Sequence, residues 1–219
     1  MKPLDFTELV FTDRGRLYTA SLCPGKRIYG ERLLSQEGVE YREWDPRRSK
    51  LSAYLTVGGD TFPLKNDSKV LYLGASSGTT PSHVADVCSK GKVYCVEFAQ
   101  RMFRDLVRTC ETRPNMRPIL GDATQPDGYA MFADGIDVVY QDVAQKRQAE
   151  IACLNMERFD AEWGMVAVKA KSEDVTASEE SIFRASEKVI KDHGYEIVDS
   201  RSIEPYEKSH QMIVFRRKG

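Results

Sequence analysis

From Val70 to the carboxyl end, hydrophobic and polar positions follow one regular alternation. Short apolar runs of strand length alternate with longer segments in which apolar residues recur every three or four positions, as on an amphipathic helix. Strands are predicted over residues 70–73, 93–96, 118–120, 136–140, 165–169, 196–200 and 212–216, and helices over 99–112, 147–159 and 178–192. This pattern predicts an α/β fold, a Rossmann-like, doubly wound sheet of seven mostly parallel strands with helices on both faces.

The N-terminal quarter of the chain has a different pattern. It is rich in Tyr, Arg and Gly, carries short alternating runs such as "RLYTASL" and "VEYREW", and has no convincing helical pattern before Ser49. We therefore predict a small β-hairpin subdomain over residues 1–55, followed by one full α/β domain over residues 56–219.

Composition narrows the class of protein. A hydrophobic fraction of 41%, a charged fraction of 30% and a mean hydropathy of -0.47 exclude a membrane span. The N-terminal run "MKPLDFTELVF" lacks the basic and apolar regions of a secretory signal, so a cytoplasmic location is expected. The five cysteines are odd in number and have no C-x-x-C spacing, which argues against a disulfide framework or a zinc site.

The charge balance bears on possible partners. The chain has 32 Lys and Arg against 33 Asp and Glu, a net charge of -1. A protein that holds RNA unaided usually carries a basic excess to neutralise phosphates. If this chain acts on a nucleic acid, we expect other molecules to help hold the substrate.

A glycine-containing turn follows the first predicted strand of the sheet, in "VLYLGASSGTTPSHVADV". Gly74 and Gly78 would let the backbone approach a ligand closely, and Thr79 and Thr80 would offer hydroxyls and amides at the helix start. The spacing is G-x-x-x-G, neither the dinucleotide fingerprint nor a P-loop, so a pyrophosphate ligand is disfavoured. Glycines that only permit a tight turn are the alternative interpretation.

Acidic residues follow the second and third predicted strands. Glu97 ends "VYCVEF", where it could accept both hydroxyls of a ribose, and Phe98 could cover a purine. Asp122 and Ala123 in "ILGDAT" could bind an exocyclic amine and a ring nitrogen. A helix cap by Glu97 and a turn closed by Asp122 are the alternatives. Together the three strand ends favour an adenosine with an amino-acid tail and no phosphate, which is S-adenosyl-L-methionine.

The fourth strand ends with Asp142, in "IDVVYQDVAQ". Its carboxylate could steady a sulfonium or take a proton from an attacking hydroxyl. A helix N-cap is the third interpretation.

Several motifs together resemble the fibrillarin family, in the short archaeal form that has no Gly/Arg-rich tail. They are "VLYLGASSGTT", "GKVYCVEF", "PILGDAT", "QDVAQ", "VAVKAKSEDVT" and "EPYEKSH", nearly colinear from about Tyr29 onward. The resemblance implies an S-adenosyl-L-methionine-dependent methyltransferase that modifies ribose 2′-hydroxyls of rRNA and tRNA. It also implies that the protein acts within a box C/D ribonucleoprotein, together with a guide RNA, a Nop-type scaffold protein and a kink-turn-binding, ribosomal-like protein.

The resemblance also implies roles for individual residues. It implies a catalytic set of Lys50, Asp142, Lys169 and His210. Cofactor contacts are implied at Thr79, Thr80, Glu97, Phe98, Asp122, Ala123, Asp142, Val143, Ala144 and Gln145. In this interpretation Asp142 is the general base, the lysines orient it or bind a phosphate, and His210 relays a proton or positions the ribose. No metal ligand is implied.

Some features depart from the family pattern or have another explanation. Ser209 and Gln211 flank His210 where archaeal relatives usually have an acid and a small residue, and Ser76 replaces a common alanine. His83 and His193 are better explained by core packing and helix C-capping. A free-standing methyltransferase of proteins or small molecules, and an inactive structural subunit of a ribonucleoprotein, remain as alternative functions.

Overall fold

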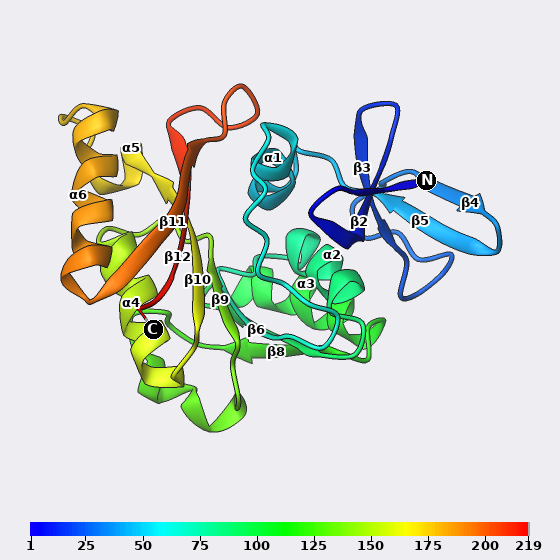
Figure 1. The fold of residues 1–219 in the computed structure, drawn as a ribbon. Coiled ribbons are helices and arrows are strands. Elements are labelled where there is room, and N and C mark those ends of the chain that lie inside the picture. Colours follow the sequence, from blue (N-terminus) through cyan, green and yellow to red (C-terminus); the bar gives the residue numbers. More distant parts are fainter. Residues whose placement is uncertain (219) are drawn as a thin grey trace.

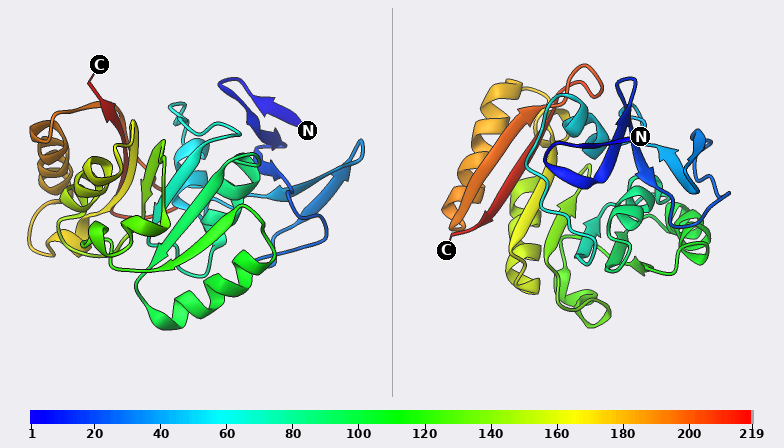
Figure 2. Two further views of the ribbon diagram at one scale, coloured as in Figure 1. Left: turned by 90° about the horizontal axis from the view of Figure 1, so that it is seen from below. Right: turned by 45° about the vertical axis from the view of Figure 1, so that its right-hand side comes forward.

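The computed structural model describes residues 1–218, which form two sheets of different kinds (Figures 1 and 2). The smaller sheet is antiparallel and five-stranded, in the order β1-β2-β3-β5-β4. Its strands are β1 (Lys2–Leu4), β2 (Thr7–Asp13), β3 (Arg16–Ala20), β4 (Leu33–Gln36) and β5 (Val39–Glu43). The two runs predicted as strands by their alternation become β3 and β5, which confirms the β character of the N-terminal part.

The larger sheet has seven strands in the order β11-β12-β10-β9-β6-β7-β8. They are β6 (Lys69–Leu73), β7 (Lys92–Glu97), β8 (Met116–Leu120), β9 (Val138–Gln141), β10 (Trp163–Lys169), β11 (Tyr195–Ser202) and β12 (His210–Arg217). Strand β12 is antiparallel to both of its neighbours, and the other pairs are parallel. The predicted α/β fold with a mostly parallel sheet is therefore confirmed.

Helices cover both faces of the larger sheet, as Figure 1 shows with α4 and α6 on one side and α2 and α3 on the other. The bounds are α1 (Lys50–Thr56), α2 (Thr79–Val87), α3 (Gln100–Glu111), α4 (Gln148–Phe159), α5 (Ala170–Glu173) and α6 (Glu179–Asp192), with single 3₁₀ turns at Pro126–Gly128 and Ala130–Phe132. Each face has its own apolar core, one shared with the small sheet and one beneath α4 and α6. Within residues 1–218, no helix combines the length and the apolar character needed to cross a membrane.

A buried polar network joins the small sheet to α2 and the end of α3. Arg42 of β5 pairs with Asp86 of α2 at 2.6 Å and with Glu31 at 2.5 Å, and Arg113 pairs with the other Asp86 oxygen at 2.5 Å. All four side chains are essentially inaccessible to solvent. Since a buried charge is tolerated only when it is paired, this network specifies how the small sheet packs. His83 is fully buried there, as predicted.

Candidate functional site

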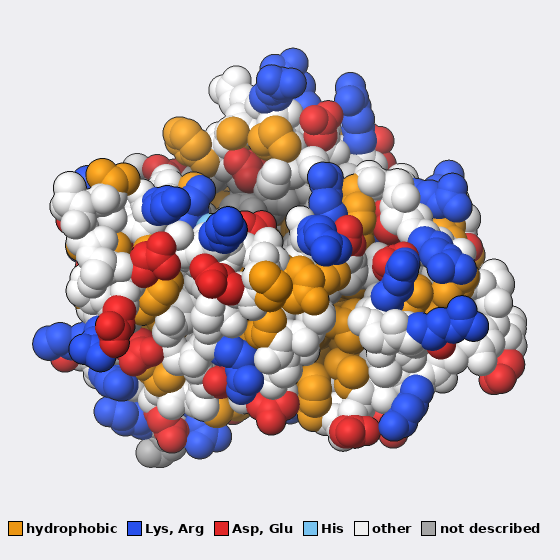
Figure 3. All heavy atoms as spheres, turned by 90° about the horizontal axis from the view of Figure 1, so that it is seen from above, with side chains coloured by type: hydrophobic (Ala, Val, Ile, Leu, Met, Phe, Trp, Pro, Cys, Tyr) orange, Lys and Arg blue, Asp and Glu red, His pale blue; other side chains and the backbone are white. Residues whose placement is uncertain are grey.

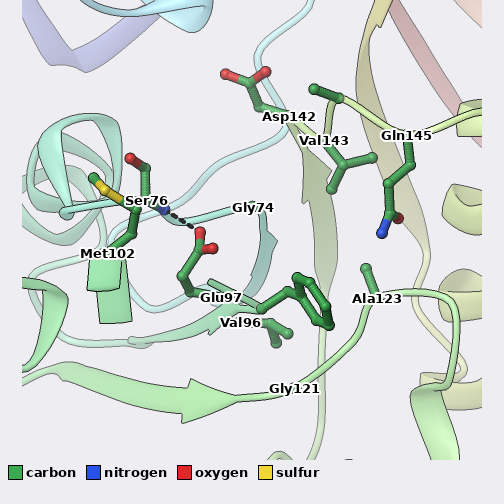
Figure 4. Close-up of a pocket in the computed structure, with 12 residues that line it drawn as sticks. Gly74, Ser76, Val96, Glu97, Met102, Gly121, Ala123, Asp142, Val143 and Gln145 are labelled. Carbon is green, nitrogen blue, oxygen red and sulfur yellow. Dashed lines mark hydrogen bonds between the residues drawn. The ribbon is translucent and has the colours of Figure 1, made fainter. Parts of the chain in front are cut away.

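The candidate site lies at the carboxyl edge of the larger sheet, where the strand order reverses between β6 and β9. The loops that follow β6, β7, β8 and β9 meet there around a cavity of about 280 Å³ (Figure 4). The lining residues are Gly74, Ser76, Val96, Glu97, Phe98, Met102, Gly121, Ala123, Asp142, Val143, Ala144 and Gln145. The topology thus brings the four predicted strand ends together.

Gly74 and Gly78 are required by the geometry of the first loop. Gly74 has a φ of +79°, and a Cβ atom there would lie 2.2 Å from the carbonyl oxygen of Asp142. Gly78 has a φ of +93° at the N-cap of α2, and its Cβ would lie 2.8 Å from Cγ2 of Thr109. Both glycines therefore permit close packing, and Gly74 brings the first loop against the end of the fourth strand.

Glu97 is buried at the end of β7 and is fixed by two backbone donors. The Ser76 amide donates to Oε2 at 2.7 Å, as the dashed line in Figure 4 shows, and the Ala99 amide donates to Oε1 at 2.7 Å. Ala99 is the N-cap of α3, so the carboxylate caps this helix and lines the cavity at the same time. Each oxygen keeps a second lone pair that can accept from a ligand hydroxyl.

The loop after β8 contributes Gly121 and Ala123 to the cavity. Oδ1 of Asp122 accepts hydrogen bonds from the amide and the hydroxyl of Thr124, at 2.9 and 2.8 Å, so Asp122 closes a turn. Phe98 lies along the cavity and is 67% exposed, which leaves its ring free to cover a planar ligand.

Gln145 lies opposite Ala123 across the cavity in Figure 4. Its Oε1 atom is buried and has no hydrogen-bond partner among residues 1–218. Because Oε1 has almost no accessible surface, it is the rest of the Gln145 side chain that faces the cavity.

A second, more polar cavity of about 530 Å³ adjoins the first and shares Asp142 with it. Nζ of Lys50, at the start of α1, lies 2.9 Å from Oδ2 of Asp142, and the two side chains are 19% and 24% exposed. Thr79 and Thr80 also line this cavity. The N-cap interpretation of Asp142 is wrong, because α4 begins after Arg147.

Lys169 and His210 are register partners on β10 and β12, beside the end of β9. Within the described residues 1–218, the linings of these two cavities include Lys50 and Asp142 but neither Lys169 nor His210. Nδ1 of His210 is 2.7 Å from the Lys208 carbonyl oxygen, a geometry that favours a proton on Nδ1. Burial lowers the pKa of His210. The hydrogen bond to the Lys208 carbonyl raises this pKa, and the positive charge of Lys50 lowers it further. His210 is therefore neutral at neutral pH.

The residues that flank His210 connect its strand to α6. Ser209 has a φ of +61°, and its hydroxyl donates to Glu179 at 2.5 Å. The Gln211 amide donates to the hydroxyl of Ser200 on β11 at 2.5 Å and to Glu187 of α6 at 3.2 Å. These departures from the family pattern therefore anchor β12 on the side of α6.

The sequence reasoning missed several lining residues. The first cavity is also lined by Ser76, Val96, Met102 and Gly121. Val96 and Gly121 could have been predicted, because each is next to a predicted ligand residue in the sequence. Met102 lies one turn into α3, and only the packing of this helix against the first loop brings it to the cavity. The arrangement can hold a nucleoside in the first cavity and a second polar substrate in the other, with the Lys50–Asp142 pair between them.

Known proteins resemble the chain over nearly its whole length. The family model described as Fibrillarin matches residues 6–219. The fibrillarin-like rRNA/tRNA 2′-O-methyltransferase of Methanopyrus kandleri is 49% identical over 214 residues, which cover 96% of this chain and 92% of that protein.

Two solved structures connect the fold to a ligand and to a partner. Aeropyrum pernix fibrillarin, in complex with natively bound S-adenosyl-L-methionine, has a TM-score of 0.85 at 42% identity and covers 91% of this chain and 88% of its own. Fibrillarin from a fibrillarin/Nop5p complex has a TM-score of 0.89 at 38% identity and covers 96% of this chain and 98% of its own. With a family model that spans almost every residue and a relative that is nearly half identical, the chain belongs to the fibrillarin family.

Proposed function

We propose that the chain is an S-adenosyl-L-methionine-dependent RNA ribose 2′-O-methyltransferase. The observation that carries this proposal is the position of Asp142, which lines both cavities and is paired with Lys50. One cavity has the features of a nucleoside site and the other has the polar lining that a ribose and its phosphates require. The 49% identical relative is named for this reaction on rRNA and tRNA.

The residues of the first cavity fit the cofactor. The free lone pairs of Glu97 suit ribose hydroxyls, and the exposed Phe98 ring suits an adenine face. Gln145 lines the same cavity and would contact the ligand there. Asp122 and Ala123 would contact the base edge. Gly74, Gly78, Thr79 and Thr80, with Val143 and Ala144 on the facing loop, would surround the amino-acid tail and the sulfur. S-adenosyl-L-methionine supplies a methyl group on a positively charged sulfur, which is an electrophile.

The chain must make a ribose hydroxyl nucleophilic and align it. In our proposal, Asp142 accepts the 2′-hydroxyl proton while the oxygen forms a bond to the methyl carbon and the carbon–sulfur bond breaks. Lys50 holds the carboxylate at the junction of the cavities, with Nζ 2.9 Å from Oδ2. Lys169 would bind the adjacent phosphate, and neutral His210 would position the ribose or receive the proton in turn.

The net charge of the chain and the complex formed by one relative both support a proposal about binding partners. The net charge of -1 is low for a protein that holds RNA alone. We propose that a box C/D guide RNA selects the nucleotide and that a Nop-type scaffold and a kink-turn-binding, ribosomal-like protein hold the RNA. A relative is known in complex with Nop5p. In this arrangement residues 56–219 form the methyltransferase domain and residues 1–55 a subdomain beside the substrate.

The decisive experiment is reconstitution with guide RNA, target RNA, both partner proteins and cofactor labelled in its methyl group. We expect methylation of the guided ribose by the wild type and its loss in Asp142→Ala. Asp192→Ala, which removes an exposed carboxylate on α6, is the matched control and should stay active. Undiminished transfer by Asp142→Ala would exclude Asp142 as the base. No transfer by the wild type, with cofactor binding intact, would indicate a structural subunit instead.

A further inference from the structure

Two consecutive arginines line the polar cavity beside the proposed catalytic pair. Arg47 and Arg48 precede α1 and share the wall of the cavity with Lys50 and Asp142. Their backbone is held in a turn by Asp45, since the Arg47 amide donates to its side chain at 2.9 Å and the Arg48 amide to its carbonyl at 3.0 Å. The turn therefore fixes where the two side chains begin.

Aromatic rings support both guanidinium groups. The Arg47 guanidinium carbon is 6.0 Å from the centre of the Tyr206 ring, and that of Arg48 is 5.8 Å from the centre of the Tyr29 ring. Tyr29 is itself fixed, because its hydroxyl is within hydrogen-bond distance of the Glu43 carbonyl oxygen and of the His83 ring. A guanidinium that lies over an aromatic ring keeps the N–H groups at its rim free to donate.

Among residues 1–218, neither arginine has an acidic partner within 4.0 Å. The ion pairs within 4.0 Å that residues 1–218 form include neither guanidinium. Of the two acids that line the cavity, Asp142 is already paired with Lys50, and Glu207 is half-buried and follows Tyr206 in the chain. Within residues 1–218, the cavity thus carries two guanidinium groups that form no ion pair.

The cavity continues toward the small sheet. Arg48 also lines an adjoining groove of about 430 Å³, together with Arg32 at the start of β4. Of the three acids of this groove, Glu31 and Glu43 are paired with Arg42 and Arg16, and Asp45 accepts from the Arg47 amide. Figure 3 shows a face that is hollowed near its middle, with Lys and Arg side chains as well as Asp and Glu side chains around the hollow. A chain of phosphates could therefore lead from Asp142 past Arg48 onto the N-terminal sheet.

We propose that Arg47 and Arg48 form a phosphate-binding site that holds the RNA backbone next to the target ribose, with the strand continuing along Arg32. This inference rests on the proposed methyl transfer to RNA. Guanidinium groups bind phosphate oxygens through paired N–H donors. Such contacts fix the position of the strand and carry no sequence information, which suits an enzyme whose target is chosen by base pairing. The N-terminal sheet then contributes directly to substrate binding.

The test measures binding of the full-length protein to a short single-stranded oligoribonucleotide by fluorescence anisotropy, over a series of salt concentrations. The variants are Arg48→Ala, the double variant Arg47→Ala with Arg48→Ala, and Arg184→Ala, which removes an exposed arginine on α6. Each lost phosphate contact should reduce the slope of log K against log salt by about 0.7 for a single strand. Between about 50 and 200 mM salt, this corresponds to roughly threefold less loss of affinity for each missing contact.

We expect the double variant to bind RNA more weakly, with the slope reduced by about 1.4, and Arg184→Ala to match the wild type. Absence of wild-type binding at the lowest salt, or equal weakening by all variants, would overturn the proposal. Calorimetry with S-adenosyl-L-methionine should give the same affinity for all four proteins, which excludes misfolding.

If the wild type methylates RNA but the double variant keeps its RNA affinity, this site is wrong and the function stands. If the double variant loses RNA affinity but no protein transfers methyl, the function is wrong and the site stands.

Discussion

The contact between Gly74 and the end of β9 makes a quantitative prediction. In Gly74→Ala, a side chain at a φ of +79° costs about 1–2 kcal/mol. The new Cβ would begin 2.2 Å from the Asp142 carbonyl oxygen, where contacts under 3.0 Å essentially never occur, so the two backbones must separate by about 1 Å. This movement stretches the 2.9 Å hydrogen bond from the Asp142 amide to Leu73, which adds about 1 kcal/mol.

The total expected loss is about 2–3 kcal/mol in the free energy of unfolding, measured by urea denaturation. Because the movement displaces Asp142, methyl transfer should fall by roughly 100-fold or more. Gly25→Ala is a matched control, since Gly25 also has a φ of +79° but a Cβ atom there would have nothing within 4 Å. It should lose only the conformational cost and keep its activity. Equal losses of stability in the two variants would show that the close contact is unimportant.

Three further predictions concern ionisable side chains. Lys50→Met should reduce single-turnover methyl transfer by about 100-fold or more, because it removes the group that orients Asp142. Cofactor affinity measured by calorimetry should stay nearly unchanged, and a parallel loss of that affinity would contradict the role of Lys50. Arg42→Met should cost about 3–5 kcal/mol in urea unfolding, because it leaves Asp86 buried without one of its partners, and a loss below about 1 kcal/mol would refute the argument. Burial lowers the pKa of His210, so the unfolded chain takes up this proton first and stability should fall as the pH drops below 6.5. Urea titrations should show a shallower fall for His210→Gln, and an unchanged pH profile would exclude the contribution.

Much of the fold and part of the site could be predicted from the sequence. Seven apolar runs and three amphipathic segments predicted the larger sheet and its main helices. A strand or helix that is buried on one or both faces has its hydrophobic residues at regular spacing, and this spacing can be read from the sequence. Glu97 and Gly74 were found because strands of one parallel sheet end at the same edge. The short α5 and the 3₁₀ turns left no such period and were not predicted.

The sequence by itself determined the order of strands and helices along the chain, the glycine turn and the residue types at the strand ends. These features depend on local periodicity and on backbone conformations that few residue types can adopt. Only the tertiary structure decided which side chains meet. Three contacts join segments that are separate in the chain. They are the pairing of Lys50 with Asp142, the buried pair of Arg42 and Asp86 between the small sheet and α2, and the position of Arg48 over the Tyr29 ring. Such contacts depend on how the two sheets pack, and no local pattern encodes that packing.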